Sequence, residues 1–298
     1  MTVLELIEAS AAQLEAAGLT FENGFGQGTT NAFDEAAWLV MWQLGLPLDD
    51  LDSVSNRPVA PAERSQVATL LGARISTRKP AAYLTHEAWL MGVPFYVDER
   101  VIIPRSFIAE LLVDESIDPW LGEDTRRVLD LCTGNGSLAV LAAMTYPDVL
   151  VDAADISPDA LAVARINIDK HALGSRITLI ESDGLAACHG LTNGGYDLIL
   201  CNPPYVNAAS MAALPAEFKA EPVLALAGNM SGGSDGMDFI RSLFLTAAAH
   251  MSENAVLVLE IGNERDNFER AFPQLEPLWF ETSAGSDQVM LLTREQLV

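Results

Sequence analysis

The most informative part of the sequence is Val128-Leu129-Asp130-Leu131-Cys132-Thr133-Gly134-Asn135-Gly136, where a short apolar run leads into a glycine turn. An apolar helical stretch, Leu138–Met144, follows at once. Gly134 and Gly136 let the backbone approach a ligand closely, and the first free N–H groups of a helix suit a carboxylate or phosphate. The pattern predicts a ligand-binding turn between a strand and a helix; the alternative is a plain helix-capping turn.

From Arg127 onward, short apolar runs alternate with helical stretches such as Ala160–His171. The runs are Arg127–Leu131, Leu150–Ala154, Ile177–Ile180, Asp197–Cys201 and Ala255–Ile261. This alternation is typical of an α/β fold whose mostly parallel sheet is covered on both faces. Two final runs, Leu278–Thr282 and Val289–Leu292, are joined by a short connection, which favours an antiparallel pair at the edge of the sheet.

The region before this fold has a different pattern. A capping box at Thr2 to Glu5 opens an amphipathic helix, a second helix is expected from about Asp34, and Pro61 begins a third. Short apolar runs on either side of Gly92 indicate a β-hairpin. We therefore expect three parts: a small helical domain over residues 1–84, a hairpin linker over 85–106, and an α/β domain over 107–298.

Two acids follow later strands of the expected sheet. Asp155 ends the strand after the glycine turn, where a carboxylate typically binds ribose hydroxyls. Asp183 follows the third strand and is placed to accept a hydrogen bond from an adenine amino group, unless it is an ordinary exposed loop acid. A nicotinamide enzyme would share these features, so they leave the cofactor open.

Asn202-Pro203-Pro204-Tyr205 follows the fourth strand directly, at the edge where open α/β sheets bind ligands. The two prolines stiffen the turn. The Asn202 oxygen and a nearby backbone carbonyl can then accept hydrogen bonds from one NH₂ group. Tyr205 offers a flat face to a planar amide or base. The alternative is a β-turn with an aromatic side chain in the core.

This turn suits methyl transfer to an amide nitrogen. A glutamine amide is a poor nucleophile, and hydrogen bonds accepted from its NH₂ group favour the arrangement that frees the nitrogen lone pair. S-adenosylmethionine carries an excellent leaving group, so catalysis rests on positioning and electrostatic complementarity. The chemistry requires no metal, and the four histidines show no ligand spacing.

The composition of the chain limits which partners it is expected to bind. The formal charge of −24 repels nucleic-acid phosphates and favours a basic partner, or it serves solubility alone. No apolar window approaches a membrane span, and the first residues carry no basic cluster, so neither membrane insertion nor a signal peptide is expected. Three cysteines without CxxC pairing fit a reducing, cytoplasmic compartment.

Glycine loop, strand-end acid and Asn-Pro-Pro-Tyr turn together resemble the HemK-like protein glutamine methyltransferases over nearly the whole chain. Four further stretches resemble the PrmB branch, whose members methylate a glutamine of large-subunit ribosomal protein L-three. These are the segments from Gly26 to Ala36, Ala82 to Thr85, Tyr96 to Val101, and Ile103-Pro104-Arg105-Ser106-Phe107-Ile108-Ala109-Glu110. The resemblance implies a Rossmann-like methyltransferase sheet behind a helical substrate-recognition domain.

The resemblance also implies residue roles. Cys132, Thr133, Gly134 and Gly136 would form the loop that binds the methionine part of S-adenosylmethionine, and Asp155 and Asp183 would hold ribose and adenine. Asn202, Pro203, Pro204 and Tyr205 would hold the glutamine amide, with catalysis assigned to Asn202, Pro203 and Tyr205.

The chain departs from the branch at Asn135, where serine is common, and in a longer loop at Asn229 to Gly233. Three other functions stay open at this point. They are methylation of the Gly-Gly-Gln motif of release factors, adenine amino-methylation of nucleic acid, and non-catalytic binding in ribosome assembly. Against the nucleic-acid substrate stand the acidic charge and the lack of a basic, aromatic-studded stretch.

Overall fold

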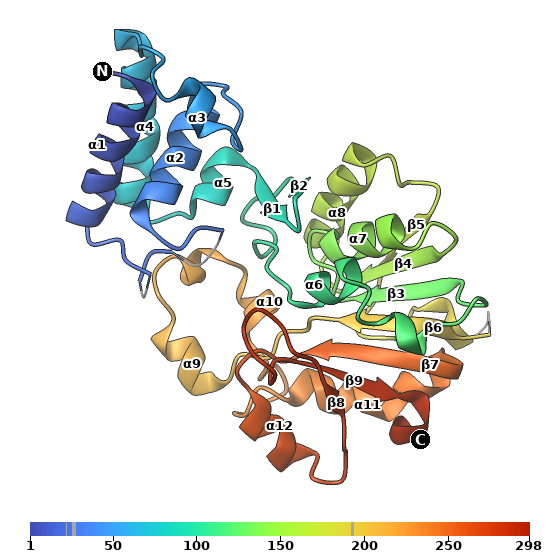
Figure 1. The fold of residues 1–298 in the computed structure, drawn as a ribbon. Coiled ribbons are helices and arrows are strands. Elements are labelled where there is room, and N and C mark those ends of the chain that lie inside the picture. The colour runs from blue at the N-terminus through green and yellow to red at the C-terminus, as the bar shows by residue number, and fades with distance from the viewer. Residues whose placement is uncertain (22, 26–27, 192–193) are drawn as a thin grey trace. The chain divides into compact units, whose positions relative to one another are not determined.

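The computed structural model describes residues 1–21, 23–25, 28–191 and 194–298, which form two compact units (Figure 1). The first unit comprises Met1–Ala88, Val97–Glu99 and Leu214–Glu221, and the second comprises Trp89–Tyr96, Arg100–Ala213 and Pro222–Val298. Consecutive segments of the chain therefore alternate between the units. The expected boundaries at residues 84 and 106 stay a prediction.

The first unit is helical. Its helices are α1 (Val3–Ala16), α2 (Ala32–Gln43), α3 (Leu51–Val54), α4 (Pro61–Thr77) and α5 (Ala81–Thr85). The capping box forms, because Thr2 and Glu5 each satisfy a backbone N–H of the other. Asn31 caps α2 through the N–H of Asp34 at 2.9 Å. The apolar faces of α1, α2 and α4 pack into one buried cluster that includes Ile7, Leu14, Leu39, Val40 and Leu71.

The expected hairpin is present as a two-stranded sheet of β1 (Ala88–Leu90) and β2 (Val93–Phe95). Met91 and Gly92 form its turn with φ of 49° and 76°. Both central residues therefore have positive φ, as in the tight turns whose twist matches that of the two strands.

The second unit is built on a seven-stranded sheet with the order β5-β4-β3-β6-β7-β9-β8. The strands are β3 (Arg127–Leu131), β4 (Leu150–Asp155), β5 (Ile177–Glu181), β6 (Tyr196–Cys201), β7 (Met251–Glu260), β8 (Leu278–Trp279) and β9 (Val289–Thr293). Strands β3 to β7 run parallel, while β9 is antiparallel to β7 and β8 to β9. The expected α/β class with an antiparallel edge is confirmed.

Strand β8 is shorter than the apolar run Leu278–Thr282 suggested. The N–H of Phe280 still bonds to the Val289 carbonyl, but Thr282 and Gly285 then bond to each other in a local turn. The chain beyond Phe280 satisfies its backbone groups within that turn and so leaves the ladder.

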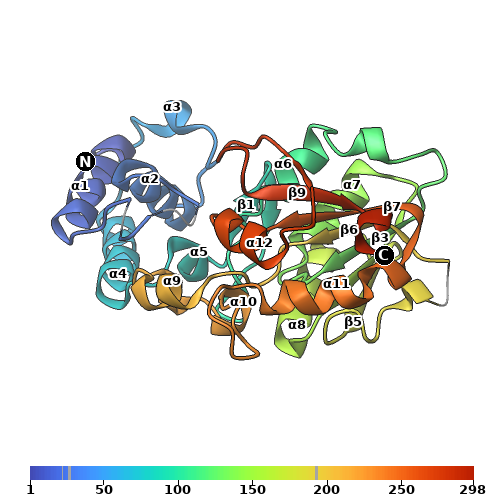
Figure 2. The same cartoon turned by 90° about the horizontal axis from the view of Figure 1, so that it is seen from below.

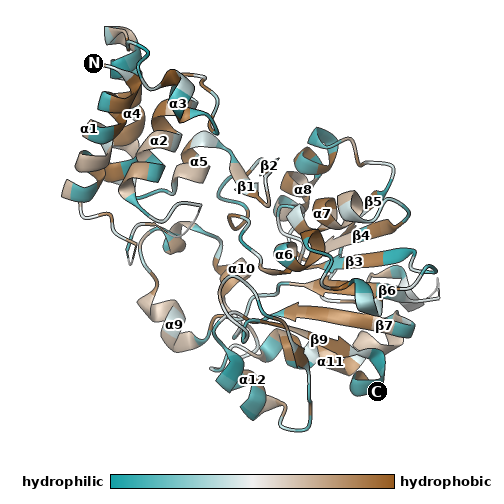
Figure 3. Cartoon of the chain, viewed as in Figure 1, coloured by the Kyte–Doolittle hydropathy of each residue, from teal (hydrophilic) through white to brown (hydrophobic). Residues whose placement is uncertain are grey.

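Helices cover both faces of the sheet (Figures 2 and 3). The helices of the second unit are α6 (Ile108–Val113), α7 (Ser137–Thr145), α8 (Pro158–Lys170), α9 (Ala208–Ala213), α10 (Val223–Leu226), α11 (Asp238–His250) and α12 (Arg265–Ala271). Of these, α6 and α7 pack on one face of the sheet and α11 and α12 on the other. Along β6, Leu198 and Leu200 face the core under α6 and α7, whereas Ile199 and Cys201 face the core under α11 and α12. No helix of the described residues is long and apolar enough to cross a membrane.

The position of β3 sets the position of the site. After β3 the chain passes through α7 to β4, which pairs with one edge of β3. Strand β6 pairs with the other edge. Strand order therefore reverses at β3, and the crevice outside the carboxyl ends at such a point is where open α/β sheets bind ligands.

A carboxyl group buried at this point, that of Asp130 on β3, joins the strand to the turn and to α7. Its Oδ2 accepts hydrogen bonds from the hydroxyl of Thr133 and from the N–H of Ala139 at 2.9 Å. The other oxygen, Oδ1, has no hydrogen-bond partner among the described residues. Burial raises the pKa of Asp130 from 3.8 to about 7, and the negative charge of Asp155 adds to the rise.

This shift predicts a stability difference that depends on pH. Between about pH 4 and pH 7 the folded chain keeps the Asp130 proton and the unfolded chain loses it, so this group lowers stability as pH rises. Asn in its place keeps an acceptor for both donors and does not titrate. The unfolding free energy of Asp130→Asn, relative to the parent, should therefore increase from pH 5 to pH 7, with a limit of about 1.4 kcal/mol per pH unit. Urea titrations at pH 5, 6, 7 and 8 measure it, and parallel curves for the two proteins would contradict the assignment.

Candidate active site

A cavity of about 620 Å³ lies at the carboxyl ends of the parallel strands, within the second unit. Leu131 at the end of β3, Asp155 at the end of β4, Asp183 after β5 and Asn202 after β6 all line it. Its volume is within the range of pockets that bind a cofactor-sized molecule. The sheet thus brings together acids and a turn that are far apart in the sequence.

The glycine loop forms one wall of this cavity. Cys132, Gly134 and Gly136 have positive φ values of 64°, 56° and 80°. Glycine adopts this left-handed conformation without strain, and glycine occupies two of these three positions. A Cβ at Gly136 would lie only 3.1 Å from the Cβ of Ala164 on α8, so a side chain there would also press on that helix. The loop residues Cys132, Thr133 and Gly134 line the cavity, while Gly136 serves the turn from outside the lining.

Side chains already occupy part of the N-terminus of α7. The N–H of Ser137 donates to Asn135 Oδ1 at 3.2 Å, and the N–H of Ala139 donates to Asp130. The helix therefore offers a ligand fewer free N–H groups than the sequence pattern suggested. Asn135 compensates in part: it lines the cavity, and its buried Nδ2 has no partner among the described residues.

The two acids differ in their surroundings. Asp155 is half-buried, and its Oδ2 accepts from the N–H of Gly134 at 2.9 Å while its Oδ1 accepts from the N–H of Ser157 at 2.9 Å. Burial raises its pKa above the ordinary value. Each carboxylate oxygen has a second lone pair, so both can still accept from a ligand hydroxyl. Asp183 is exposed at the rim of the cavity.

The Asn202–Tyr205 turn presents only part of itself to the cavity. Asn202 and Pro204 are half-buried and line it, whereas Pro203 and Tyr205 are not among the lining residues. The Tyr205 ring packs against Gly262, where a Cβ would lie 2.7 Å from a ring carbon. Tyr205 thus braces the turn from behind.

Glu260, at the end of β7, is a site residue that the sequence reasoning passed over. Its Oε2 accepts from the Ser106 hydroxyl at 2.6 Å and from the N–H of Phe107 at 2.9 Å. Burial raises the pKa of Glu260 to about 7. Burial also raises the pKa of Tyr205, and a hydrogen bond with Glu260 adds to that rise. A lone acid in the apolar run Ala255–Ile261 was the signal that could have found it.

The longer loop at Asn229–Gly233 also reaches the cavity, through Met230 and Ser231. Asn229 orders its base by donating to the Val206 carbonyl and accepting from the N–H of Gly236. Asp238 accepts from the N–H groups of Ser231 and Gly233 at 2.9 and 3.0 Å. The loop is therefore fixed by side-chain hydrogen bonds beside the turn that carries Asn202.

Cys132, in the loop that lines the cavity, lies beside Cys201. The hydrogen bond to Cys201 and burial raise the pKa of the Cys132 thiol well above its ordinary value, so Cys132 stays a neutral thiol. All three cysteines are free. Within the described part of the chain, no group of three or more His, Cys, Asp or Glu side chains is arranged to hold a metal ion.

The fold has a counterpart among solved structures. The hMettl16 catalytic domain in complex with MAT2A 3'UTR hairpin 1 matches with a TM-score of 0.52 over 78% of this chain and 80% of that chain. The sequence identity is 14%, so the match shows the Rossmann-like methyltransferase fold alone.

Sequence comparison is more specific. The Methyltransferase small domain family model matches residues 109–230. The chain is 50% identical to a ribosomal protein uL3 glutamine methyltransferase of Bordetella pertussis, over 99% of this chain and 96% of the relative. A protein of the same name from Burkholderia pseudomallei is 48% identical over 99% and 95%, and one from Bradyrhizobium diazoefficiens is 41% identical over 100% and 92%. This chain therefore belongs to the family of ribosomal protein uL3 glutamine methyltransferases.

Proposed function

We propose that this chain transfers a methyl group from S-adenosylmethionine to the side-chain amide nitrogen of a glutamine in ribosomal protein uL3. The observation that carries the proposal is full-length similarity to relatives of that name, combined with an Asn-Pro-Pro-Tyr turn whose Asn202 and Pro204 line the strand-end cavity. The alternative substrate within the wider family, a release factor, lacks such support among these relatives.

The residues around the cavity fit S-adenosylmethionine. Cys132, Thr133 and Gly134 would hold its methionine part, and the unpaired Asn135 Nδ2 is a buried donor suited to a carboxylate. Gly136 would keep the loop in shape. Asp155 would accept from the ribose hydroxyls and Asp183 from the adenine amino group. When bound, this cofactor supplies an electrophilic methyl group on a positively charged sulfur.

The chain's own part in the reaction is to hold the amide. The Asn202 side-chain oxygen and a backbone carbonyl of the turn would accept hydrogen bonds from the glutamine NH₂ group, which orients the nitrogen lone pair toward the methyl group. Pro203 and Pro204 limit the turn to one backbone shape. Tyr205, held against Gly262 and Glu260, would keep Asn202 in place.

The helical region over residues 1–84 would recognise the protein substrate, with residues 85–106 as linker and 107–298 as the methyltransferase domain. Ribosomal proteins are basic as a class, which complements a chain with a formal charge of −24. The same charge disfavours direct binding of nucleic acid. We place the reaction in the cytoplasm, where ribosomal proteins are made.

Labelling tests the function directly. The purified chain, given S-adenosylmethionine with a radioactive methyl group and a mixture of ribosomal proteins, should label uL3, and peptide mapping should place the label on a glutamine. A release factor serves as the competing substrate in a parallel reaction. Stronger labelling of the release factor than of uL3, or label on an RNA strand, would refute the proposal.

Asn202 variants test the mechanism. Asn202→Ala should keep the fold and the cofactor affinity, because the two prolines still set the turn, but turnover should fall by roughly 10²–10³-fold through loss of one oriented acceptor. Asn202→Asp keeps an acceptor and should retain more activity. Methyl transfer, cofactor calorimetry and thermal unfolding are measured on both variants. Turnover of Asn202→Ala near the parent rate would show that the amide is held by other groups.

Salt tests the role of acidity. Attraction between an acidic enzyme and a basic substrate is screened within ~8 Å at physiological ionic strength, so the association rate with uL3 should fall as salt rises. Stopped-flow measurements from about 25 to about 300 mM salt give the dependence of the association rate on salt concentration. Over this range the screening length falls from well above to below its physiological value. A flat response would remove any role of the −24 charge in recognition.

A further inference from the structure

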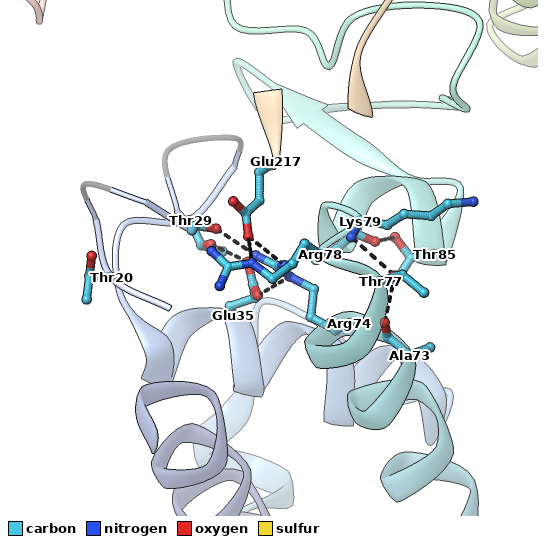
Figure 4. A network of polar contacts seen from close by, with 12 residues as sticks. Thr20, Thr29, Glu35, Ala73, Arg74, Thr77, Arg78, Lys79, Thr85 and Glu217 are labelled. Atoms are coloured by element: carbon cyan, nitrogen blue, oxygen red, sulfur yellow. Dashed lines mark hydrogen bonds and ion pairs between the residues drawn. The ribbon is translucent and has the colours of Figure 1, made fainter. Parts of the chain in front are cut away.

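One arginine of the helical unit is completely buried among polar partners (Figure 4). Arg74, on the last turns of α4, donates through Nε to Glu35 at 2.8 Å, through Nη1 to Glu217 at 3.1 Å, and through Nη2 to the Gly24 carbonyl at 2.6 Å. Its side chain is 0% exposed, and those of Glu35 and Glu217 are 4% and 1% exposed. All four residues belong to the first unit.

A second arginine completes the cluster. Arg78 follows Arg74 by one helical turn, donates through Nε to the same Glu217 oxygen at 2.6 Å, and reaches the Asn23 carbonyl through Nη2. The two guanidinium groups balance the two carboxylates, so the buried cluster carries no net charge. The second oxygen of Glu217 is buried without a hydrogen-bond partner among the described residues. The burial of Glu217 therefore depends on its two arginines.

The cluster also explains a sequence motif that the reaction does not use. Glu35 belongs to the stretch from Gly26 to Ala36, of which Gly26 and Gln27 lie outside the described residues. Its Oε2 accepts from the Thr29 hydroxyl of the same stretch at 3.2 Å. Burial raises the pKa of Glu35, although Arg74 opposes the rise. The motif thus supplies one wall of the Arg74 site.

The position of Glu217 in the chain connects the cluster with the active site. Glu217 lies in Leu214–Glu221, a segment that packs with the helical unit, while the residues up to Ala213 and from Pro222 onward belong to the other unit. The segment follows the Asn202–Tyr205 turn along the chain. Directly after it come Pro222 and Leu224, which line the cavity. Fixing Glu217 therefore restrains a connection between two parts of the active site.

Stability alone is a weak reason for such a cluster. Removing ions from water is costly, and well-packed apolar residues in the same place are often as stabilising. What a buried ion pair does provide is a specific partner, because a carboxylate that loses its arginines cannot stay buried. Once Glu35 and the Gly24 carbonyl are in place, the remaining Nη1 of Arg74 pairs with Glu217.

We propose that Arg74 and Arg78 form a clasp for Glu217, and that Glu217 is a positioning residue that holds Leu214–Glu221 so that the active-site segments on either side keep their productive arrangement for the protein substrate. The activity readout of this proposal rests on the proposed function. A second readout, cleavage of the segment itself, does not.

The test compares Glu217→Gln with the parent as full chains. Lys219 is exposed within the segment, so cleavage by trypsin after Lys219 reports its release. We expect cleavage there to become roughly tenfold faster, because proteolysis follows the population of the open form. The kcat/KM for uL3 should fall by about 3- to 30-fold, while calorimetry finds the parent affinity for S-adenosylmethionine.

Two further variants make the result specific. Glu269→Gln removes the same charge from an exposed pair with Arg265 on α12 and should match the parent in cleavage and turnover. Arg78→Lys keeps the charge of a partly exposed clasp residue but loses the planar fork, and should give a smaller change of the same kind. If Glu217→Gln fails to fold, the cleavage and turnover of Arg78→Lys test the clasp in its place.

Unchanged cleavage after Lys219 in Glu217→Gln and Arg78→Lys would overturn the clasp. Faster cleavage with unchanged kcat/KM would overturn the positioning role. An equal loss of cofactor affinity and turnover, with a lower melting temperature, would assign the cluster to stability alone and also overturn the proposal. If the parent chain does not methylate uL3, the proposed function fails, and the cleavage rates still decide the clasp.

Discussion

The buried Asp130 carboxyl group is the interaction on which the site depends. It joins β3 to Thr133 in the glycine loop and to Ala139 in the first turn of α7 through two hydrogen bonds. From there the N–H of Gly134 reaches Asp155 at the end of β4. Burying an ionisable group costs free energy, and the raised pKa of Asp130 reflects this cost. The same carboxyl group supplies hydrogen bonds that connect strand, loop and helix at one wall of the cavity. A reaction that works by positioning needs such a wall.

A second buried acid, Glu260, holds another part of the chain beside the site. Glu260 accepts hydrogen bonds from Ser106 and Phe107 and forms a further hydrogen bond with Tyr205, the last residue of the Asn202 turn. Both acids have pKa values near 7 because the same burial that excludes water from the site also disfavours their charge. The chain therefore places carboxyl groups where they accept hydrogen bonds from its own loops, while the side chains of Asn202 and Asn135 line the cavity.

In the helical unit, too, a buried ionisable side chain joins distant segments, but there it is a cation. Arg74 is a buried cation that gathers Glu35, Glu217 and a backbone carbonyl, and Arg78 balances the charge. In each unit a buried ionisable group joins segments that share no helix or strand. Hydrogen bonds of this kind are directional, so they select one arrangement among several that would bury similar apolar area.

The sequence by itself determined the α/β class, the antiparallel edge, the glycine loop and the Asn-Pro-Pro-Tyr turn, because strand alternation and turn chemistry are local and leave their pattern in neighbouring residues. Only the tertiary structure decided that Tyr205 braces the turn from outside the cavity lining, that Asp130 and Asn135 occupy the start of α7, and that β8 ends early. It alone paired Ser106 with Glu260 across 154 residues and Arg74 with Glu217 across 143. Such pairs depend on which strands and helices become neighbours, and a single sequence carries no local signal for a contact between residues so far apart.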